Sequence, residues 1–287
     1  MGRRTSALLL SIVLIAAVFC GGCTGGTTET NGHADDKMIV AVSILPQADF
    51  VEHVGGEKVG TVVLIPPGAS PATYEPTASQ LRDISKADLY MALGSGIPFE
   101  KAWMEKIHAA NSDMKIVNTS AGVDLKQGDP HMWLSPKQAI VQVENIYQAL
   151  AQADPENKDY YYQNKEKYID GLKKLDSDIT EAVSRSDNRS FMVFHPAWGY
   201  YARDYGLEMI TVEEEGKEPS PADIDRYVKK AKDKGITVVF VQPQFSQSSA
   251  KSIADEIGGS VVAVNPLARD YQGNMRNVTD TFVRNLK

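Results

Sequence analysis

The sequence contains only two cysteines among its 287 residues, and both stand near its start, at Cys20 and Cys23. The rest of the chain therefore has no thiol, which excludes structural disulfides and cysteine metal ligands from it. A metal site in this chain must use histidine, carboxylate, amide or backbone ligands. Histidine is scarce as well, because the whole chain has five.

The sequence also lacks an apolar run long enough to span a bilayer comfortably. Arg3 and Arg4 precede an apolar stretch over residues 7–19, which predicts the core of a signal peptide and not a membrane helix. The stretch ends in FCGGC, as in a prokaryotic lipoprotein leader (residues 1–22). We expect cleavage after this leader and lipid attachment to Cys23, which anchors an exported protein to the outer face of the cytoplasmic membrane. A secretory leader cut elsewhere is the alternative.

An excess of basic charge is absent too. Without the leader arginines, the chain carries 28 basic and 37 acidic residues, a formal charge of −9. This balance argues against nucleic acid as a partner and against a basic membrane-binding face. Residues 23–36 are rich in Gly, Thr, Asn and Asp and have no apolar pattern, so they are predicted to be a flexible tether. We expect the body to be a monomer.

Strands and amphipathic helices alternate in two blocks of the body. The first block, 37–155, begins with the apolar strand MIVAVSI, and the second, 186–287, begins again with SFMVF. Between them, apolar residues at helical spacing predict one long helix over 156–185. The pattern predicts an α/β fold with two lobes, each a parallel sheet flanked by helices, joined by that helix. Ligands of such lobes gather in the loops at the carboxyl ends of the strands.

Two histidines lie in loops of this kind. His131 stands in GDPHMWLSP between two turns, and His195 follows the apolar strand of SFMVFHPAW. From these residues alone, His131 fits a solvated loop residue better than a ligand, because a histidine in a loop is usually a solvated polar residue. His195 can equally be a core histidine with satisfied hydrogen bonds.

Six motifs occur in order along nearly the whole body: LIPPGASPATYEP, DPHMWLSP, FHPAWGYYARDYGL, GKEPSPADI, VFVQPQFSQSSAKSIADEIGG and NPLARDY. Together they resemble the zinc/manganese substrate-binding lipoproteins of ABC transporters, whose two lobes are joined by a rigid helix. The resemblance implies capture of a divalent metal ion, Zn²⁺ or Mn²⁺, between the lobes and its delivery to a membrane permease. It implies no catalysis.

The resemblance also implies a set of metal ligands from four loops. His131 and His195 match the second and third positions of this set. The first position, a histidine in the family, is Ala72 here, and the fourth, usually an aspartate, is Asn265. Two imidazoles and a neutral amide compensate a divalent charge poorly, and Zn²⁺ typically takes four ligands. Half of the expected set is therefore altered.

A carboxylate from the second lobe is expected to complete the shell together with Asn265. Glu213 and Glu215, in TVEEEGKEP, are the nearest candidates, although a triplet of acidic residues is more often a solvated loop. Asp270, in ARDY, is expected instead to cap the last helix.

Two other functions compete with a metal receptor. A zinc-dependent hydrolase can be built from two histidines, a glutamate and an open water position, but the sequence has neither HExxH nor a serine nucleophile elbow. A surface lipoprotein that kept the scaffold, lost metal binding and serves adhesion or sensing is the more serious alternative, because of Ala72 and Asn265.

Overall fold

The computed structural model describes residues 37–213, 219–245 and 247–286. The predicted leader, Cys23, the tether and Glu215 lie outside these ranges. Residues 37–287 form one compact unit. Within the described ranges, no helix has both the length and the apolar character needed to cross a membrane.

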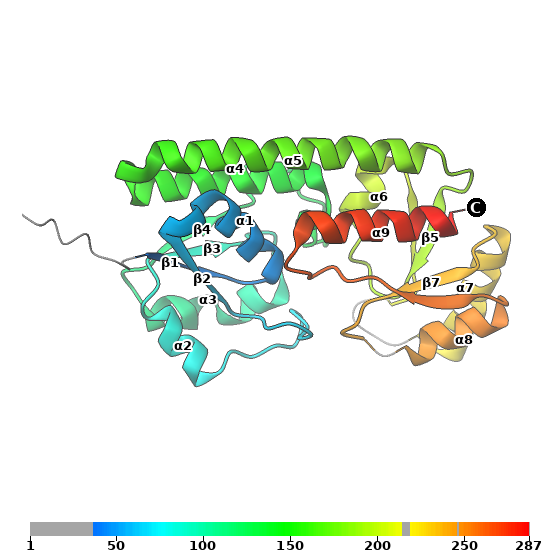
Figure 1. Ribbon diagram of the computed structural model, residues 1–287. Helices are drawn as coiled ribbons and strands as arrows, with labels where there is room; N and C mark the ends of the chain where they lie inside the picture. The colour runs from blue at the N-terminus through cyan, green and yellow to red at the C-terminus, as the bar shows by residue number, and fades with distance from the viewer. Residues whose placement is uncertain (1–36, 214–218, 246, 287) are drawn as a thin grey trace, which may run out of the picture. The chain divides into compact units, whose positions relative to one another are not determined.

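Two parallel sheets organise the described chain, and they repeat one strand order (Figure 1). The first sheet has the order β2-β1-β3-β4 and the second the order β6-β5-β7-β8. The strands are β1 (Met38–Val42), β2 (Val59–Val63), β3 (Leu89–Ala92), β4 (Lys115–Asn118), β5 (Ser190–Val193), β6 (Glu208–Thr211), β7 (Val238–Val241) and β8 (Ser260–Ala263).

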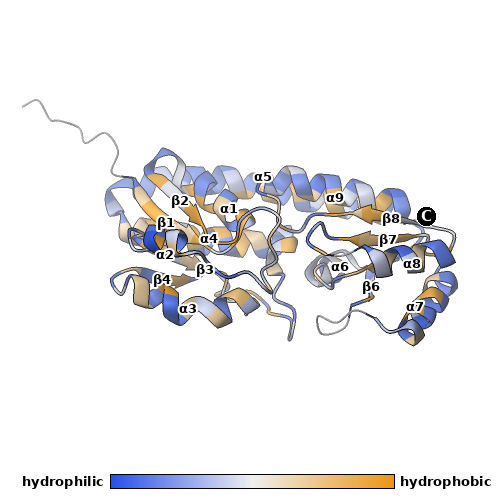
Figure 2. Ribbon diagram, turned by 90° about the horizontal axis from the view of Figure 1, so that it is seen from below, coloured by the Kyte–Doolittle hydropathy of each residue, from blue (hydrophilic) through white to orange (hydrophobic). Residues whose placement is uncertain are grey.

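Helices flank both sheets, and in Figure 2 the strands are mainly apolar whereas the helices show a hydrophilic side. The α-helices are α1 (Leu45–Gly55), α2 (Ala78–Ile84), α3 (Pro98–Ala110), α4 (Pro136–Ala153), α5 (Lys158–Ser184), α6 (Gly199–Tyr205), α7 (Pro221–Asp233), α8 (Ser248–Glu256) and α9 (Tyr271–Asn285). Short 3₁₀ turns are η1 (Gly56–Lys58), η2 (Met132–Leu134) and η3 (Pro155–Asn157). The predicted α/β fold with two parallel-sheet lobes is confirmed.

Local sequence sets the ends of several helices. Thr77 and Ser220 each form a capping box with the residue three positions later, which satisfies amide groups that a helix start leaves free. The Asp270 carboxylate accepts a hydrogen bond from the Gly273 amide at 2.9 Å, so its predicted role as the cap of α9 is confirmed. Gly206 ends α6 in the left-handed conformation, with φ of 66°, which glycine adopts without a steric cost.

The long helix α5 contacts the helices of both sheets. It starts two residues later than predicted, because residues 155–157 form a 3₁₀ turn. In the first half of α5, the Tyr168 hydroxyl donates to Asp49 of α1 at 2.6 Å. Further along, Asp176 accepts from the Tyr205 hydroxyl of α6 at 2.8 Å. The predicted apolar stripe is buried throughout and comprises Tyr161, Tyr168, Leu172, Leu175, Ile179 and Val183.

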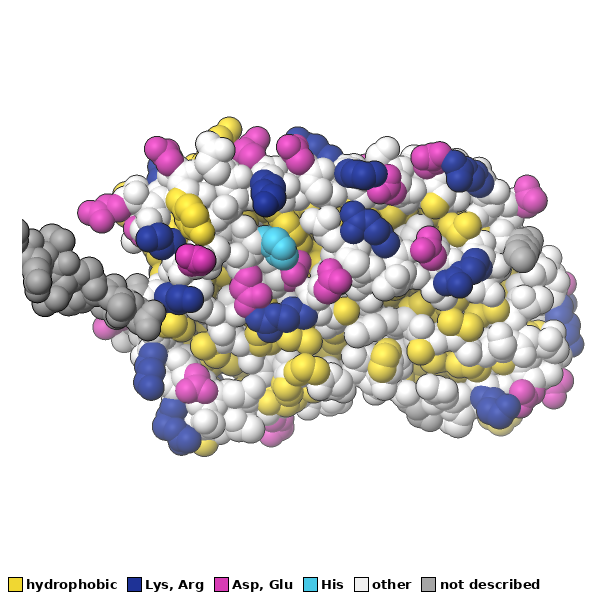
Figure 3. All heavy atoms as spheres, in the orientation of Figure 1, with side chains coloured by type: hydrophobic (Ala, Val, Ile, Leu, Met, Phe, Trp, Pro, Cys, Tyr) yellow, Lys and Arg dark blue, Asp and Glu magenta, His cyan; other side chains and the backbone are white. Residues whose placement is uncertain are grey.

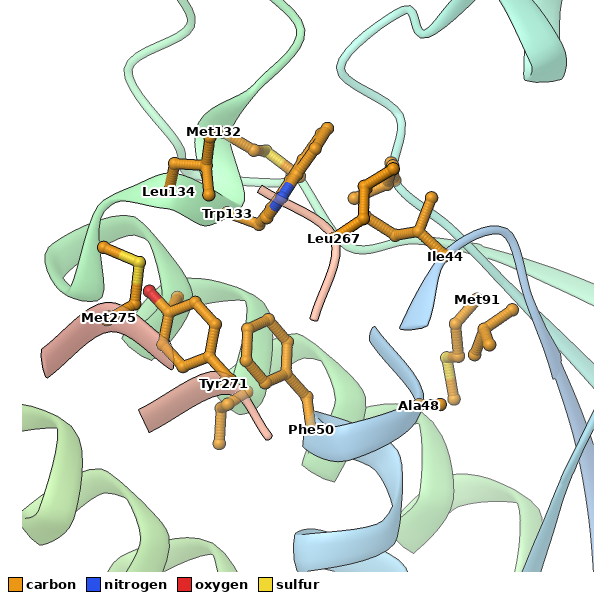
Figure 4. Close-up of a cluster of buried hydrophobic side chains, with 14 of the residues drawn as sticks. Ile44, Ala48, Phe50, Met91, Met132, Trp133, Leu134, Leu267, Tyr271 and Met275 are labelled. Atoms are coloured by element: carbon orange, nitrogen blue, oxygen red, sulfur yellow. The ribbon is translucent and has the colours of Figure 1, made fainter. Parts of the chain in front are cut away.

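The C-terminal helix α9 forms a second connection between the lobes, which the sequence pattern did not predict. At its start, the Tyr271 ring meets Phe50 of α1 edge-on at 4.9 Å. Near its end, the Phe282 ring packs on Phe191 of β5 and Phe240 of β7. Figure 4 shows the buried cluster around the start of α9, where the labelled side chains include Ala48, Phe50, Trp133, Leu267, Tyr271 and Met275.

Charged side chains of both signs are mixed over the face of the molecule shown in Figure 3, without a large patch of one sign. The described residues on this face therefore offer no basic track along which a nucleic acid backbone could bind.

Candidate metal-binding site

Loops at the carboxyl ends of strands from both sheets line one cavity of about 560 Å³. Ala72 follows β2, Ile97 follows β3, and His131 lies in the long segment after β4. From the second sheet, His195 follows β5 and Glu213 follows β6. The place predicted for a ligand, at the carboxyl ends of parallel strands, is therefore where the cavity lies.

The two predicted histidines face each other in this cavity. The Nε2 atoms of His131 and His195 are 3.4 Å apart, and the two rings are nearly perpendicular, at 84°. Two nitrogen ligands at the usual zinc distance of about 2.05 Å in a tetrahedral shell lie about 3.3 Å from each other. The observed separation thus suits two imidazoles that share one metal ion.

A carboxylate holds the other nitrogen of each ring. The Nδ1 atom of His131 lies 2.9 Å from Asp129 Oδ1, and the Nδ1 atom of His195 lies 2.7 Å from Glu213 Oε2. An ionised carboxylate only accepts hydrogen bonds, so each Nδ1 carries the proton. Both Nε2 atoms then present lone pairs to the cavity with no hydrogen between them. This arrangement is typical of histidines that bind a metal ion.

Burial favours the metal-binding form of His131. Its side chain is 15% exposed, and burial lowers its pKa below the ordinary value of 6.5, against the opposing effect of Asp129. A neutral imidazole can donate an electron pair to a metal, whereas an imidazolium cannot.

Aromatic rings form part of the cavity wall. The Phe245 ring stacks on His195 with centroids 4.7 Å apart, and Trp133 packs against His131 at 5.2 Å. The Trp133 indole donates a hydrogen bond to the Pro266 carbonyl at 2.8 Å, which ties the His131 segment to the loop after β8. Trp133 is therefore a wall residue of the cavity.

The structure does not bring all the predicted ligands to the facing Nε2 atoms. The Asn265 side-chain oxygen accepts from the Leu267 amide at 2.9 Å, and Asn265 is not among the residues that line the cavity. Glu213 lines the cavity, but its carboxylate is bound to the far side of the His195 ring. Glu215 lies outside the described residues.

A histidine in place of Ala72, as the family has at this position, would line the same cavity. Ala72 lines the cavity, and its amide donates to the Ser70 hydroxyl at 3.2 Å, which holds the loop in a local turn. In the described ranges, no three His, Cys, Asp or Glu side chains are grouped so that they could hold a metal ion. The two imidazoles are thus the centre of the site, and its shell is incomplete.

Sequence reasoning missed three polar residues of this site. The signal for Asp129 is local, because an acid two residues before a loop histidine is within reach of that histidine's amide and ring. Gln242 and Gln244, in the QPQF segment after β7, also line the cavity. Their position after an apolar strand is the signal that could have found them.

A helix of the second lobe holds the segment that carries His131. The Tyr200 hydroxyl of α6 accepts from the Lys126 amide at 2.8 Å and donates to the Asp129 carbonyl at 3.3 Å. The Lys126 ammonium group donates to the Gly199 carbonyl at 3.1 Å. His131 is therefore positioned from both lobes.

Comparison with known proteins places these features in a family context. The family described as ZnuA, "Zinc-uptake complex component A periplasmic", matches residues 40–285. The "High-affinity zinc uptake system protein ZnuA" of Bacillus subtilis is 30% identical in an alignment 306 positions long, gaps included. This alignment covers 96% of this chain and 94% of that protein. The "Manganese-binding lipoprotein MntA" of Halalkalibacterium halodurans is 28% identical, with 96% of this chain and 97% of that protein covered.

A solved structure agrees with the same context. The crystal structure of a ZnuA protein superposes with a TM-score of 0.84 at 37% identity, and the match covers 88% of this chain and all of the other. The names of the two relatives describe metal uptake and metal binding, and neither name describes an enzyme.

Proposed function

The chain belongs to the ZnuA family, and from this membership and the paired imidazoles we propose that it captures a zinc or manganese ion outside the cytoplasmic membrane. Zinc is the better match to the two nitrogen ligands, because imidazole suits Zn²⁺ whereas Mn²⁺ prefers oxygen ligands. The captured ion is then passed to the permease of an ABC importer.

The observation that carries this proposal is the 3.4 Å separation of the His131 and His195 Nε2 atoms. Two lone pairs that face each other at this distance repel, and a cation between them removes the repulsion. Asp129 and Glu213 compensate the ion's charge from behind the rings. We therefore assign metal binding to the two histidines and a positioning role to the two carboxylates.

The remaining predicted ligands have different support. Glu213 reaches the metal directly only if it leaves His195, and Asn265 only if it leaves the Leu267 amide. Glu215 stays a candidate from its sequence position alone. The domain boundaries inferred from the sequence, with lobes over 37–155 and 186–287 and a linking helix over 156–185, remain our proposal. In it, α9 belongs to the second lobe and also contacts the first.

The anchor at Cys23 is supported by the leader sequence. A Cys23→Ala variant should move from the membrane fraction to the soluble fraction of cells. Continued recovery in membranes after a carbonate wash would contradict lipid attachment at this residue.

Thermal unfolding with increasing zinc or manganese tests the proposed function. Metal that binds only the folded state stabilises it by mass action, so the melting temperature should rise with free metal. His131→Ala and His195→Ala should each abolish the rise, because one imidazole remains. His108→Ala is the matched control, since His108 lies exposed in the last turn of α3 and should leave the rise unchanged.

The pH dependence of the same measurement follows from burial. Because burial lowers the pKa of His131, this ring takes up a proton only at a lower pH than an exposed histidine does, so protonation of His131 should not weaken the metal-induced rise at mildly acidic pH. At lower pH the ring protonates and the rise should disappear. A wild-type protein that shows no rise with either metal at pH 7.5 would favour the scaffold that has lost metal binding.

A further inference from the structure

Helix α6 is attached to both of the loops that carry the histidines. Its first residue, Gly199, stands shortly after His195 in the chain. Its next-to-last residue, Asp204, accepts a hydrogen bond from the hydroxyl of Ser135, and Ser135 ends the turn that begins after His131. The Asp204 side chain is 9% exposed, and Ser135 is fully buried. One short helix therefore joins one histidine loop through the chain and the other through a buried contact.

Ser135 is the residue before helix α4, where a serine normally accepts a hydrogen bond from an amide of its own helix. Within the described chain its side chain makes no such bond, and the first turn of α4 contains no acidic residue. Instead, Ser135 Oγ and Gln138 Nε2 both donate to Asp204 Oδ2. A negative charge at this end of a helix is favourable. The second lobe thus supplies the acidic group at the start of α4.

The Asp204 side chain is charged at neutral pH. Burial alone raises the pKa of a carboxyl group, but hydrogen bonds from Arg203, Ser135 and Gln138 outweigh burial here and hold the pKa of Asp204 below its ordinary value. The Arg203 Nε atom donates to Asp204 Oδ1 at 2.7 Å, so both carboxylate oxygens accept hydrogen bonds. Hydrogen bonds to a charged group are about twice as strong as those between neutral groups. The contact between Asp204 and Ser135 therefore resists separation.

A short turn carries the position of Ser135 back to His131. In this turn, η2, the Leu134 amide donates to the His131 carbonyl at 3.1 Å, and the Ser135 amide donates to the Met132 carbonyl at 3.3 Å. All three residues of η2 are buried. Closely packed residues cannot absorb a displacement locally. A shift of Ser135 would therefore move His131 as well.

We propose that α6 sets the separation of His131 and His195, with Asp204 as a positioning residue that acts through Ser135; the proposal rests on the metal-binding function proposed above. The start of α6 holds the front of the His131 segment through Tyr200, and its end holds the rear through Asp204. Neither Asp204 nor Ser135 is among the described residues that line the cavity. Ligands held in place before binding give a higher affinity. Loss of the Asp204 contact therefore weakens metal binding without removing a ligand.

Titrations of the purified protein with zinc and with cobalt test the proposal. Asp204→Ala and Ser135→Ala should each raise the Kd for zinc about tenfold, the lower end of the range for residues that orient a metal-binding histidine. Cobalt bound in place of zinc absorbs visible light in a way that depends on the geometry of its ligands, so its spectrum should change in both variants. The double variant should lose no more affinity than the weaker-binding single variant, because both changes break the same contact.

Asp154→Ala is the matched control at the other end of α4. Asp154 follows the last residue of that helix and accepts a hydrogen bond from the Tyr161 hydroxyl at 2.7 Å, so it also pairs a carboxylate with a hydroxyl group. This variant should lower the melting temperature, as Asp204→Ala does, but should leave the Kd for zinc and the cobalt spectrum unchanged. All titrations are made at a temperature at which every variant is folded. If Asp204→Ala does not fold, Ser135→Ala decides, because it removes only one hydroxyl group.

The outcomes separate the two proposals. A wild-type protein that binds neither zinc nor cobalt defeats the metal-binding function and the positioning role together. Wild-type binding that Asp204→Ala and Ser135→Ala leave unchanged, in both affinity and spectrum, overturns the positioning role and leaves the metal function standing. An equal loss of zinc affinity in Asp154→Ala also overturns the positioning role, because the loss would then come from lower stability of the fold.

Discussion

At the scale of single residues, the site depends on which nitrogen of each histidine faces the cavity. Strand pairing explains how Glu213 makes this choice for His195. Val193 of β5 pairs with Thr211 of β6, so the residues two positions further on, His195 and Glu213, leave the sheet side by side. The sequence motif identified His195, but the two partners are 18 positions apart in the chain, so the contact could not be inferred before the pairing of β5 with β6 was known.

A Glu213→Gln variant separates positioning from direct metal binding. Glutamine still accepts a hydrogen bond from His195 Nδ1 but removes the negative charge behind the ring. We expect zinc affinity, measured by calorimetry, to fall about 10- to 100-fold, as is usual for the outer partner of a metal-binding histidine. Glu208→Gln in β6, the strand that precedes Glu213, should change the affinity little, because Glu208 pairs with Lys234. A loss as complete as that of His195→Ala would identify Glu213 as a direct ligand.

At the scale of helices and strands, sequence periodicity predicts most of the elements but not the contacts between them. Continuous apolar runs predicted the strands, and the buried stripe of α5 was read correctly, because both patterns are local. The contact between the His131 segment and α6 was not predicted. It joins Lys126 to Tyr200, 74 residues apart, and no local pattern encodes such a pairing. The hydrogen bond from the Leu267 amide to the Asn265 side-chain oxygen likewise depends on a turn that the family resemblance did not reveal.

Gly199 at the start of α6 tests the contact between that helix and the His131 segment. A β-carbon at this position would collide with the Asp129 carboxylate and approach the Lys126 ammonium at 2.9 Å. Gly199→Ala should therefore displace Asp129 and weaken zinc binding about tenfold, by loss of the outer partner of His131, although alanine favours the helix itself. Ala202→Gly, later in the same short helix, controls for helix stability: it should lower the melting temperature without a selective loss of zinc affinity. Unchanged zinc affinity in Gly199→Ala would show that Asp129 does not position His131.

At the scale of the whole described chain, the two lobes are connected by more than the predicted linking helix. Two hydrogen bonds join helix α5 to both lobes. Its Tyr168 donates to Asp49 of α1, and its Asp176 accepts from Tyr205 of α6. Helix α9 packs on Phe50 at its start and on Phe191 near its end. The sequence predicted the two lobes and the long helix, since each leaves a periodic pattern. It could not show that α9 contacts both lobes, because that depends on where the helix packs.

These connections predict that metal binding changes the spacing of the lobes little. Rotation about a hinge would have to bend α5, pull the start of α9 out of the cluster in Figure 4 and break the Trp133 bond to the Pro266 carbonyl. Each of these steps opposes a large domain closure. Small-angle scattering curves with and without zinc should therefore nearly superimpose, while hydrogen exchange slows in the loops that carry His131 and His195. Tyr271→Ala removes the contact of α9 with Phe50 and should allow a measurable change on zinc binding. A clear compaction of the wild-type protein with zinc would show that these contacts give way and that the lobes close like a hinge.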